Sequence, residues 1–215
     1  MALDVLPEHR PTLPALLGAR VRWVVWGVAA LVALVVLSSL VGGPAASTDV
    51  EVLRRSPVAF NFRHGDAFKP AALEGDEIVR IEQRRNGKLV QAFAVSPLVL
   101  PAYKGDVGGV LPIAGDALIA DLRESVEDFE LIQEGKARVN TAAGYGIVYR
   151  GRLDGTRRLY GRVVLLPEPI ASARSGVRIS ILATPAAGVG KAEDTGARGL
   201  TKKPFRSFRF GLEGP

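Results

Sequence analysis

The chain of 215 residues contains no cysteine and only two histidines. Without cysteine there is no disulfide framework, no thiolate metal site and no thiol nucleophile. His9 lies in the N-terminal tail, which leaves His64 as the single imidazole of the large C-terminal part. A zinc site needs at least three protein ligands, and no third ligand accompanies His64 and Asp66 at a telling spacing. The sequence therefore predicts no metal site and no cofactor.

Catalytic motifs are also lacking. A Ser-His-Asp device would have to use His64, and no serine of the chain stands in a nucleophile-elbow motif. We therefore expect a protein without catalytic residues. Two alternatives stay open at this point. One is an envelope hydrolase or other enzyme that uses His64 or the acidic pair Asp76 and Glu77, and the other is a lipid or small-ligand pocket between a sheet and a helix.

Charge is absent from residues 23–41, a run of nineteen residues. At about 1.5 Å per residue, a helix of that length spans the hydrocarbon core of a bilayer. Arg20 and Arg22 precede the run and no basic residue follows it before Arg54, so the positive-inside rule puts the N-terminus in the cytoplasm and the C-terminal part outside. The sequence thus predicts a single-pass cell-membrane protein with one uncleaved anchor helix, which includes Trp23, Trp26, Gly27, Leu31, Leu34 and Val41.

Two other interpretations of this apolar run remain. A cleaved secretory signal also places basic residues before an apolar stretch, and residues 44–47 could form a small-residue cleavage region. The apolar part of such a signal is usually about 7–15 residues, however, which is shorter than this run. A buried core helix would be expected to keep a polar face, which this run lacks.

The rest of the chain has the composition of a folded domain, with 47% hydrophobic and 23% charged residues overall. The net charge of +6 arises after residue 50, where the basic residues are spread along the chain, so nucleic acid is not expected as a partner. We divide the chain into a cytoplasmic tail (1–22), a transmembrane helix (23–42), a linker (43–56), an extracytoplasmic domain (57–210) and a short tail (211–215).

Alternation of apolar and polar residues predicts strands over residues 58–62, 77–84, 88–95, 130–140, 144–152, 157–166 and 176–184. Asn86-Gly87 between two such runs is a strong hairpin signal, and residues 153–156, with Asp154-Gly155 at their centre, are expected to turn the run 144–152 into the run 157–166. Asp116 is expected to cap a helix over residues 117–129, whose apolar stripe is Ile119, Leu122, Val126 and Phe129. Residues 184–199 lack an apolar period and indicate a flexible insertion, so a second covering helix is not evident. Residues 205–210 are expected to form a closing strand or a short docked end.

These elements predict an α+β domain, an antiparallel sheet with one covering helix. Their order, together with the segments FNF, FELIQEG, YGIVYRGRLDGTRRLYGRVVLL and SFRF, resembles the Mog1/PsbP-like α/β/α sandwich of LpqN-type, membrane-anchored envelope domains of actinobacteria. The resemblance covers residues 57–210. It implies a binding or assembly factor, because domains of this family are mostly not enzymes.

Basic and aromatic residues gather around one predicted hairpin. Such a surface could bind an acidic polymer, phospholipid headgroups or a partner protein, although solvated arginines on an exposed strand face would produce the same pattern. Besides the bilayer that holds the anchor, we expect an envelope protein or polymer as the partner. The candidate residues are Arg150, Arg152, Arg157, Arg158, Arg162, Tyr149 and Tyr160.

Overall fold

The structure is a computed structural model that describes residues 49–213. The predicted cytoplasmic tail, the anchor helix and the first part of the linker lie outside the described residues. Within residues 49–213, no helix is both long and apolar enough to cross a membrane.

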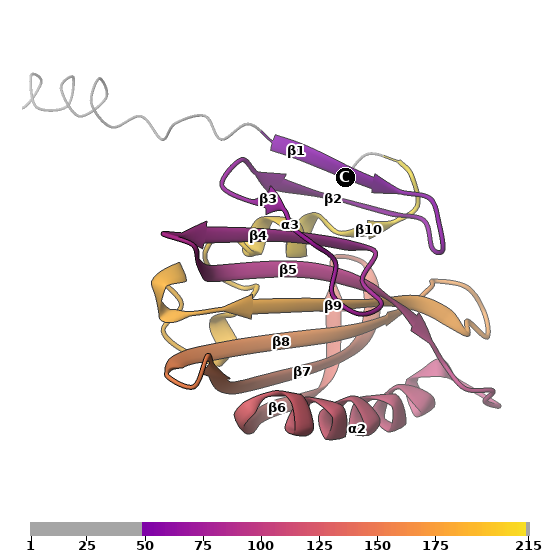
Figure 1. Ribbon diagram of the computed structural model, residues 1–215. Helices are drawn as coiled ribbons and strands as arrows, with labels where there is room; N and C mark the ends of the chain where they lie inside the picture. Colours follow the sequence, from indigo (N-terminus) through magenta and orange to yellow (C-terminus); the bar gives the residue numbers. More distant parts are fainter. Residues whose placement is uncertain (1–48, 214–215) are drawn as a thin grey trace, which may run out of the picture. The chain divides into compact units, whose positions relative to one another are not determined.

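An antiparallel sheet of seven strands forms the body of the domain, in the order β3-β4-β5-β9-β8-β7-β6 (Figure 1). Each strand pairs with neighbours that run in the opposite direction, so hairpins connect most of them. The strands are β3 (Lys69–Pro70), β4 (Val79–Arg85), β5 (Lys88–Val99), β6 (Glu127–Val139), β7 (Ala142–Leu153), β8 (Arg157–Pro167) and β9 (Ser175–Ala183).

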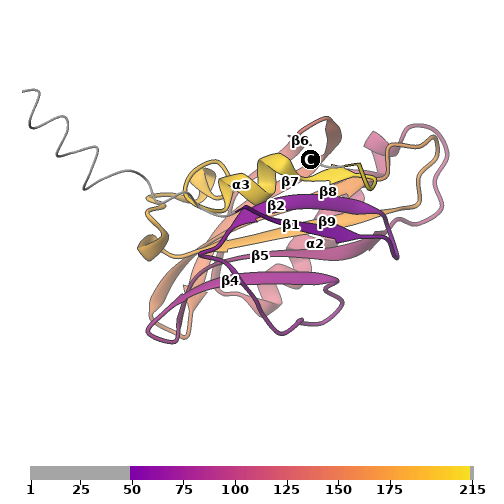
Figure 2. The same cartoon turned by 90° about the horizontal axis from the view of Figure 1, so that it is seen from above.

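A second sheet has three strands in the order β1-β2-β10 and lies against one face of the large sheet (Figure 2). Its strands are β1 (Asp49–Arg54), β2 (Phe60–Gly65) and β10 (Arg209–Phe210), and the short helix α3 (Lys202–Ser207) leads into the last of them. β1 lies in the segment expected to be a linker. The closing strand is shorter than expected, because α3 extends to Ser207.

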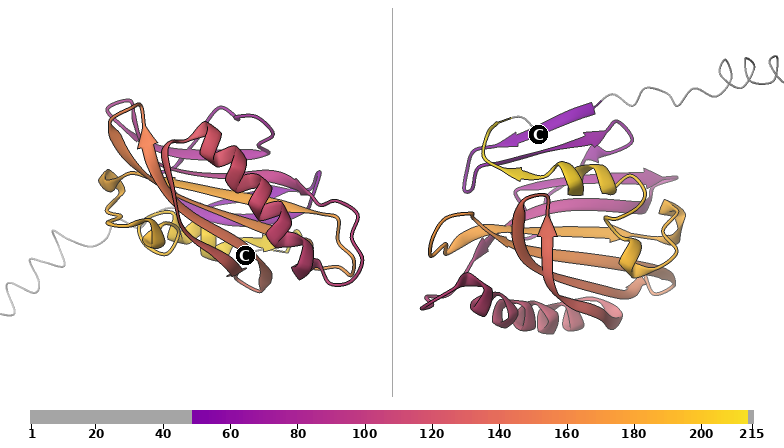
Figure 3. Two further views of the ribbon diagram at one scale, coloured as in Figure 1. Left: turned by 90° about the horizontal axis from the view of Figure 1, so that it is seen from below. Right: turned by 180° about the vertical axis from the view of Figure 1, so that it is seen from behind.

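The alternation of side chains along each strand builds a core on both faces of the large sheet. On β8, Val164 and Leu166 pack with Phe60, Phe62 and other residues of the small sheet. The intervening Val163 and Leu165 face α2 (Val107–Ser125), which also contacts β6 and β7 (Figure 3). The prediction of an α+β domain with an antiparallel sheet and one main covering helix is therefore confirmed.

The two hairpin turns follow their local sequence. Asn86 and Gly87 both have positive φ, 52° and 73°, as a two-residue turn between twisted strands requires. Asp154 and Gly155 repeat this geometry between β7 and β8, with φ of 53° and 73°. Both turns are confirmed because their conformation depends on adjacent residues alone.

The main helix begins ten residues earlier than predicted. Its N-cap is Asp106, whose carboxylate accepts a hydrogen bond from the Gly108 N–H at 2.5 Å, and not Asp116. Gly108, Gly109 and Pro112 lie within the first turns, where Val110 and Leu111 are buried against the sheet. Burial of an apolar face outweighs low intrinsic propensity in such a helix.

The helix also ends earlier than predicted. Val126 is its C-cap and Phe129 already belongs to β6. The apolar stripe is nevertheless correct, since Ile119, Leu122, Val126 and Phe129 all pack in the same cluster. The pattern identified the buried residues but not the point where the chain changes from helix to strand.

Residues 184–199 are ordered, contrary to the expected flexible insertion. They form two short 3-10 helices, η1 (Pro185–Ala187) and η2 (Ala192–Asp194), that contact β5, β7 and β8. Val189 and Ala192 are buried beside Tyr160. Burial of these two apolar residues holds the segment on the sheet. They are too few to give the apolar periodicity from which a helix or strand is predicted.

Candidate functional site

Neither of the two predicted aromatic residues is exposed on the candidate binding surface. Tyr149 points towards α2, is 3% exposed, and lies 5.4 Å from Phe129 between ring centroids. Its burial raises the pKa of the Tyr149 hydroxyl far above the ordinary value. Tyr160 lies on the opposite face, but residues 189–192 cover it and its hydroxyl donates to the Gly190 carbonyl at 3.0 Å. Neither ring is presented to a partner.

Arg157 belongs to the hairpin turn. It donates from Nη1 to the Leu89 carbonyl at 3.0 Å and pairs with Asp154. Its guanidinium therefore ties the β7–β8 turn to β5. The sequence placed it on the binding surface because it follows the turn directly.

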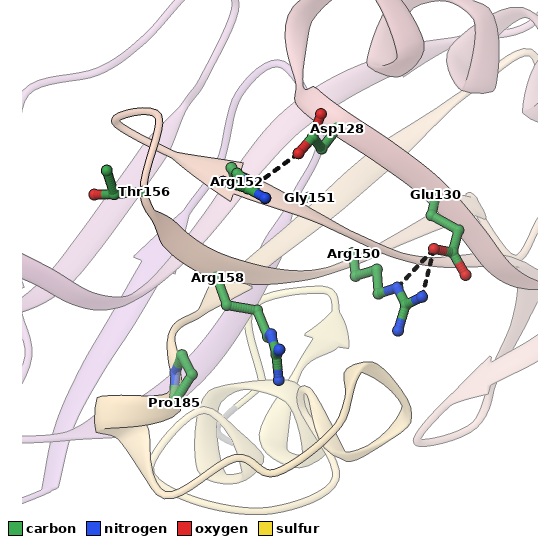
Figure 4. Close-up of a pocket in the computed structure, with 8 residues that line it drawn as sticks. All are labelled: Asp128, Glu130, Arg150, Gly151, Arg152, Thr156, Arg158 and Pro185. Carbon is green, nitrogen blue, oxygen red and sulfur yellow. Dashed lines mark hydrogen bonds and ion pairs between the residues drawn. The ribbon is translucent and has the colours of Figure 1, made fainter.

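Three of the predicted arginines, Arg150, Arg152 and Arg158, do come together on the face opposite α2. They line an open hollow of about 570 Å³ with Asp128, Glu130, Gly151, Thr156 and Pro185, here called the arginine hollow (Figure 4). β7 and β8 supply the arginines in adjacent positions, because Arg152 pairs with Arg158 in the strand register. β6 supplies the two carboxylates.

Ion pairs cross from β7 to β6 on one side of the arginine hollow. Arg150 donates to Glu130 from Nε at 2.8 Å and from Nη2 at 2.5 Å, and Arg152 Nε lies 2.6 Å from Asp128. All four side chains are about half exposed or more, and pairs of this kind contribute only about 0–1 kcal/mol. They are therefore easily exchanged for a competing anion.

Arg158 gives the hollow its net charge. Its side chain is exposed and has no ion-pair partner among residues 49–213 (Figure 4). Three guanidinium groups face two carboxylates, which leaves an excess of one positive charge at the hollow. The geometry suits a ligand with negative charge.

Arg162 lies further along β8 and is half-buried. Its Nη2 donates to the Glu193 carbonyl at 2.7 Å, and its guanidinium lies 5.8 Å from the ring centroid of Phe205. Burial lowers the pKa of Arg162, although the nearby charges of Asp194 and Glu193 oppose this. Its Nε is buried without a hydrogen-bond partner within the described residues. The Arg162 guanidinium thus has fewer hydrogen-bond partners than a buried polar group usually has.

The residues of the alternative hydrolase are separated. His64 is 3% exposed, its Nδ1 lies 2.8 Å from the Gly65 carbonyl, and its ring packs edge-on against Phe68. Asp76 pairs with Arg178 at 2.6 Å and Glu77 with Arg80 at 2.9 Å. In residues 49–213, no three side chains of His, Cys, Asp or Glu gather closely enough to hold a metal ion. No arrangement of general acid, base and nucleophile is formed around these residues.

A buried ionic network was not anticipated from the sequence. Glu82 on β4 accepts hydrogen bonds from Arg80 and Arg84, both at 2.6 Å, and Arg80 also pairs with Glu74 and Glu77. Burial alone would raise the pKa of Glu82, but the two arginines outweigh it and the pKa is lowered. The alternation of Arg80, Glu82 and Arg84 indicates a polar face on β4. It does not indicate that Glu74 and Glu77 pair with Arg80.

Comparison with known proteins addresses the fold only. No protein-family model matches the chain, and no curated protein matches it. Among solved structures, LpqN of Mycobacterium tuberculosis is similar at 8% identity with a TM-score of 0.52, over 77% of this chain and 92% of that one. The fold is Mog1/PsbP-like.

Two weaker likenesses are of the same kind. The Ran-binding protein Mog1p of Saccharomyces cerevisiae has 14% identity and a TM-score of 0.47, over 76% of this chain and 96% of that one. Cyanobacterial PsbP from Synechocystis has 14% identity and a TM-score of 0.47, over 79% and 96%.

Proposed function

We propose that the protein is a single-pass membrane-anchored interaction module. Its folded domain lies outside the membrane and binds an anionic partner protein or envelope polymer at the arginine hollow. Arg158 is the observation that carries this proposal, because an exposed guanidinium without an ion-pair partner in residues 49–213 stands beside two exchangeable ion pairs. A partner that supplies carboxylate or phosphate would complete this set.

The topology follows from the apolar residues 23–41 and the arginines before them. LpqN, whose fold is similar, is involved in cell envelope biogenesis. A role at the envelope is compatible with a domain that stands outside the bilayer.

A binding role is preferred over catalysis. His64 is buried against Phe68, and the acidic pair is engaged by Arg80 and Arg178. Activation of any of these groups would require the core or the ion pairs to be rearranged. The exposed charges of the arginine hollow need no such change.

Two measurements on intact cells test the proposal. A protease added from outside should digest the domain while a cytoplasmic marker survives; protection of the domain would overturn the topology. Cross-linking followed by purification from membranes should then recover a partner. Arg158→Gln should reduce that recovery, whereas Arg55→Gln, which removes an exposed arginine outside the hollow, should not. Equal recovery from both variants would overturn the assignment of the arginine hollow.

A further inference from the structure

The strand register arranges the arginines of this face in consecutive rows. Arg152 pairs with Arg158, Arg150 with Tyr160, and Val148 with Arg162. Rows on one face of a sheet are two residues apart, which is about 6.7 Å along the strands. Each of the three rows contains at least one guanidinium. Arginine side chains therefore follow one another along β7 and β8, and these three rows are here called the arginine ladder.

Arg162 forms the third row and stands open to a ligand. Of its nitrogens, Nη2 has a hydrogen-bond partner among the described residues, and Nε is buried without one. Arg162 is only partly buried and lines two hollows, which give a ligand access to it. Phe205 covers one side of the guanidinium and holds it in position.

Two hollows flank Arg162. One of about 210 Å³ is lined from β6, β7 and β8 and by Phe205, and its charged residues are Glu134, Lys136, Arg138 and Arg162. The other, of about 400 Å³, is lined by Arg138, Val139, Asn140, Arg162, Gly196, Ala197, Phe205 and Arg206. The charged residues of this second hollow are all arginines, and neither Arg138 nor Arg206 forms an ion pair within residues 49–213. Basic side chains therefore continue beyond the arginine hollow, and among the described residues Glu134 is the one carboxylate that lines these two hollows.

The arginine hollow and the Arg162 hollows border the same two strands. Arg150 lines the first and Val148, two residues away on β7, lines the next. On β6, Glu130 pairs with Arg150 and Gln133 with Val148, so the two hollows follow one another along both strands. A ligand that occupied both would lie along the face of β6 and β7.

We propose that this ladder binds an extended acidic segment of a partner protein, with carboxylates at alternate residues. In an extended chain, alternate side chains point the same way and repeat at about 6.7 Å, which matches the spacing of the rows. Carboxylates of the partner replace Asp128 and Glu130 at the first two rows, and one carboxylate meets Arg162 at the third. The inference rests on the proposed function and names the chemistry of the partner.

Carboxylate spacing distinguishes this segment from other anions. An acidic polymer with irregular spacing, or a lipid surface, would be attracted by net charge alone. A segment whose carboxylates come in pairs separated by two uncharged residues presents a carboxylate at only every second position of one face. Affinity should therefore depend on the order of residues in the ligand and not only on its charge.

Two labelled peptides of equal composition test this spacing. One has six Glu-Ser repeats and the other has three Glu-Glu-Ser-Ser repeats, which leave at least one of three successive rows without a carboxylate. Fluorescence anisotropy measures their binding to the full chain in neutral detergent. We expect the alternating peptide to bind about tenfold more tightly, since one charge-assisted contact is worth about this factor. Equal affinities would overturn the proposal.

Variants locate the site. Arg162→Gln and Arg158→Gln should each weaken binding of the alternating peptide about tenfold, and Arg162→Lys should retain part of the affinity. Arg55→Gln should leave it unchanged. Near-ultraviolet circular dichroism of each variant checks that the fold is kept, and the exposed Arg158 provides the test should Arg162 variants not fold. An unchanged affinity in folded Arg158→Gln would overturn the ladder.

Failure here is distinguishable from failure of the proposed function. If neither peptide bound while Arg158→Gln still reduced recovery of a partner from membranes, the acidic-segment proposal would fall and the binding module would stand. Loss of the difference between Arg158→Gln and Arg55→Gln in membranes would overturn the arginine hollow itself.

Discussion

The ring of Tyr149 on β7 lies directly over the backbone of Gly161 on β8. The two residues are paired in the strand register, and a Cβ at Gly161 would lie 2.0 Å from Cζ of Tyr149. Tyr149 packs in turn against Phe129 and the residues under α2. Because Gly161 has no side chain, the Tyr149 ring fits over it and packs under α2.

Gly161→Ala should therefore destabilise the domain. The new methyl group would push the Tyr149 ring into the core, and overpacking of this kind costs about 2 kcal/mol in the free energy of unfolding. Urea unfolding followed by circular dichroism measures the change. Gly190→Ala is the control, because a Cβ there meets no atom within 4 Å. Equal unfolding midpoints for the two variants would contradict the packing described.

The ionic network on β4 should make stability sensitive to acid. The pKa of Glu82 is lowered in the folded state, because hydrogen bonds from Arg80 and Arg84 outweigh its burial. Its contribution is therefore fully present above its unfolded pKa of about 4.3 and is lost as the pH falls through the lower folded value. Urea midpoints measured from pH 6 downward to about pH 3 should fall most steeply below about pH 4.

The same network should be costly to break. Glu82→Gln leaves two arginines without their shared carboxylate, and removal of one partner of a buried pair costs about 3 kcal/mol. Glu130→Gln removes an exposed carboxylate instead and should cost less than about 1 kcal/mol. Similar losses in the two variants would show that the β4 network is not buried in solution.

The C-terminal residues should be essential for the core. Phe208 is fully buried, and its ring stacks 5.5 Å from that of Phe60. Truncation of a buried phenylalanine costs about 4 kcal/mol, so Phe208→Ala should lower the urea midpoint strongly. Leu212→Ala removes a side chain that is 44% exposed and should have little effect. A stable Phe208→Ala variant would mean that the small sheet packs differently.

His64 should be protected from chemical modification. Its ring is buried between Phe62 and Phe68, so diethyl pyrocarbonate should modify it only after unfolding. Peptide mapping by mass spectrometry separates His64 from His9, the other histidine of the chain. Rapid modification of His64 in the folded protein would reopen the alternative in which it acts in catalysis.

Local sequence predicted the turns at Asn86 and Asp154 and the strands around them, because these depend on neighbouring residues. It misplaced the start of α2, since the burial of Val110 and Leu111 overrides a segment rich in glycine and proline. The alternation itself puts Tyr149 on the face opposite Arg150, so this part of the binding surface could have been corrected from the sequence.

The partners of the arginines could not have been predicted in the same way. Glu130 meets Arg150 only because β6 has irregularities between Glu127 and Glu130 and between Leu131 and Gln133. Such bulges change the register without a clear pattern in the residues. The hydrogen bond between Arg162 and Glu193 likewise depends on how residues 184–199 fold back, which no local signal specified.

The two edge strands of the large sheet, β3 and β6, disfavour pairing with a further strand. β3 has only two residues, and one of them, Pro70, has no N–H to offer a further strand. β6 is interrupted by two irregularities and carries charged side chains along its length. Both features discourage edge-to-edge pairing between copies. Copies of the domain should therefore not polymerise through their sheets, and the extended partner proposed above would approach across the face and not as an eighth strand.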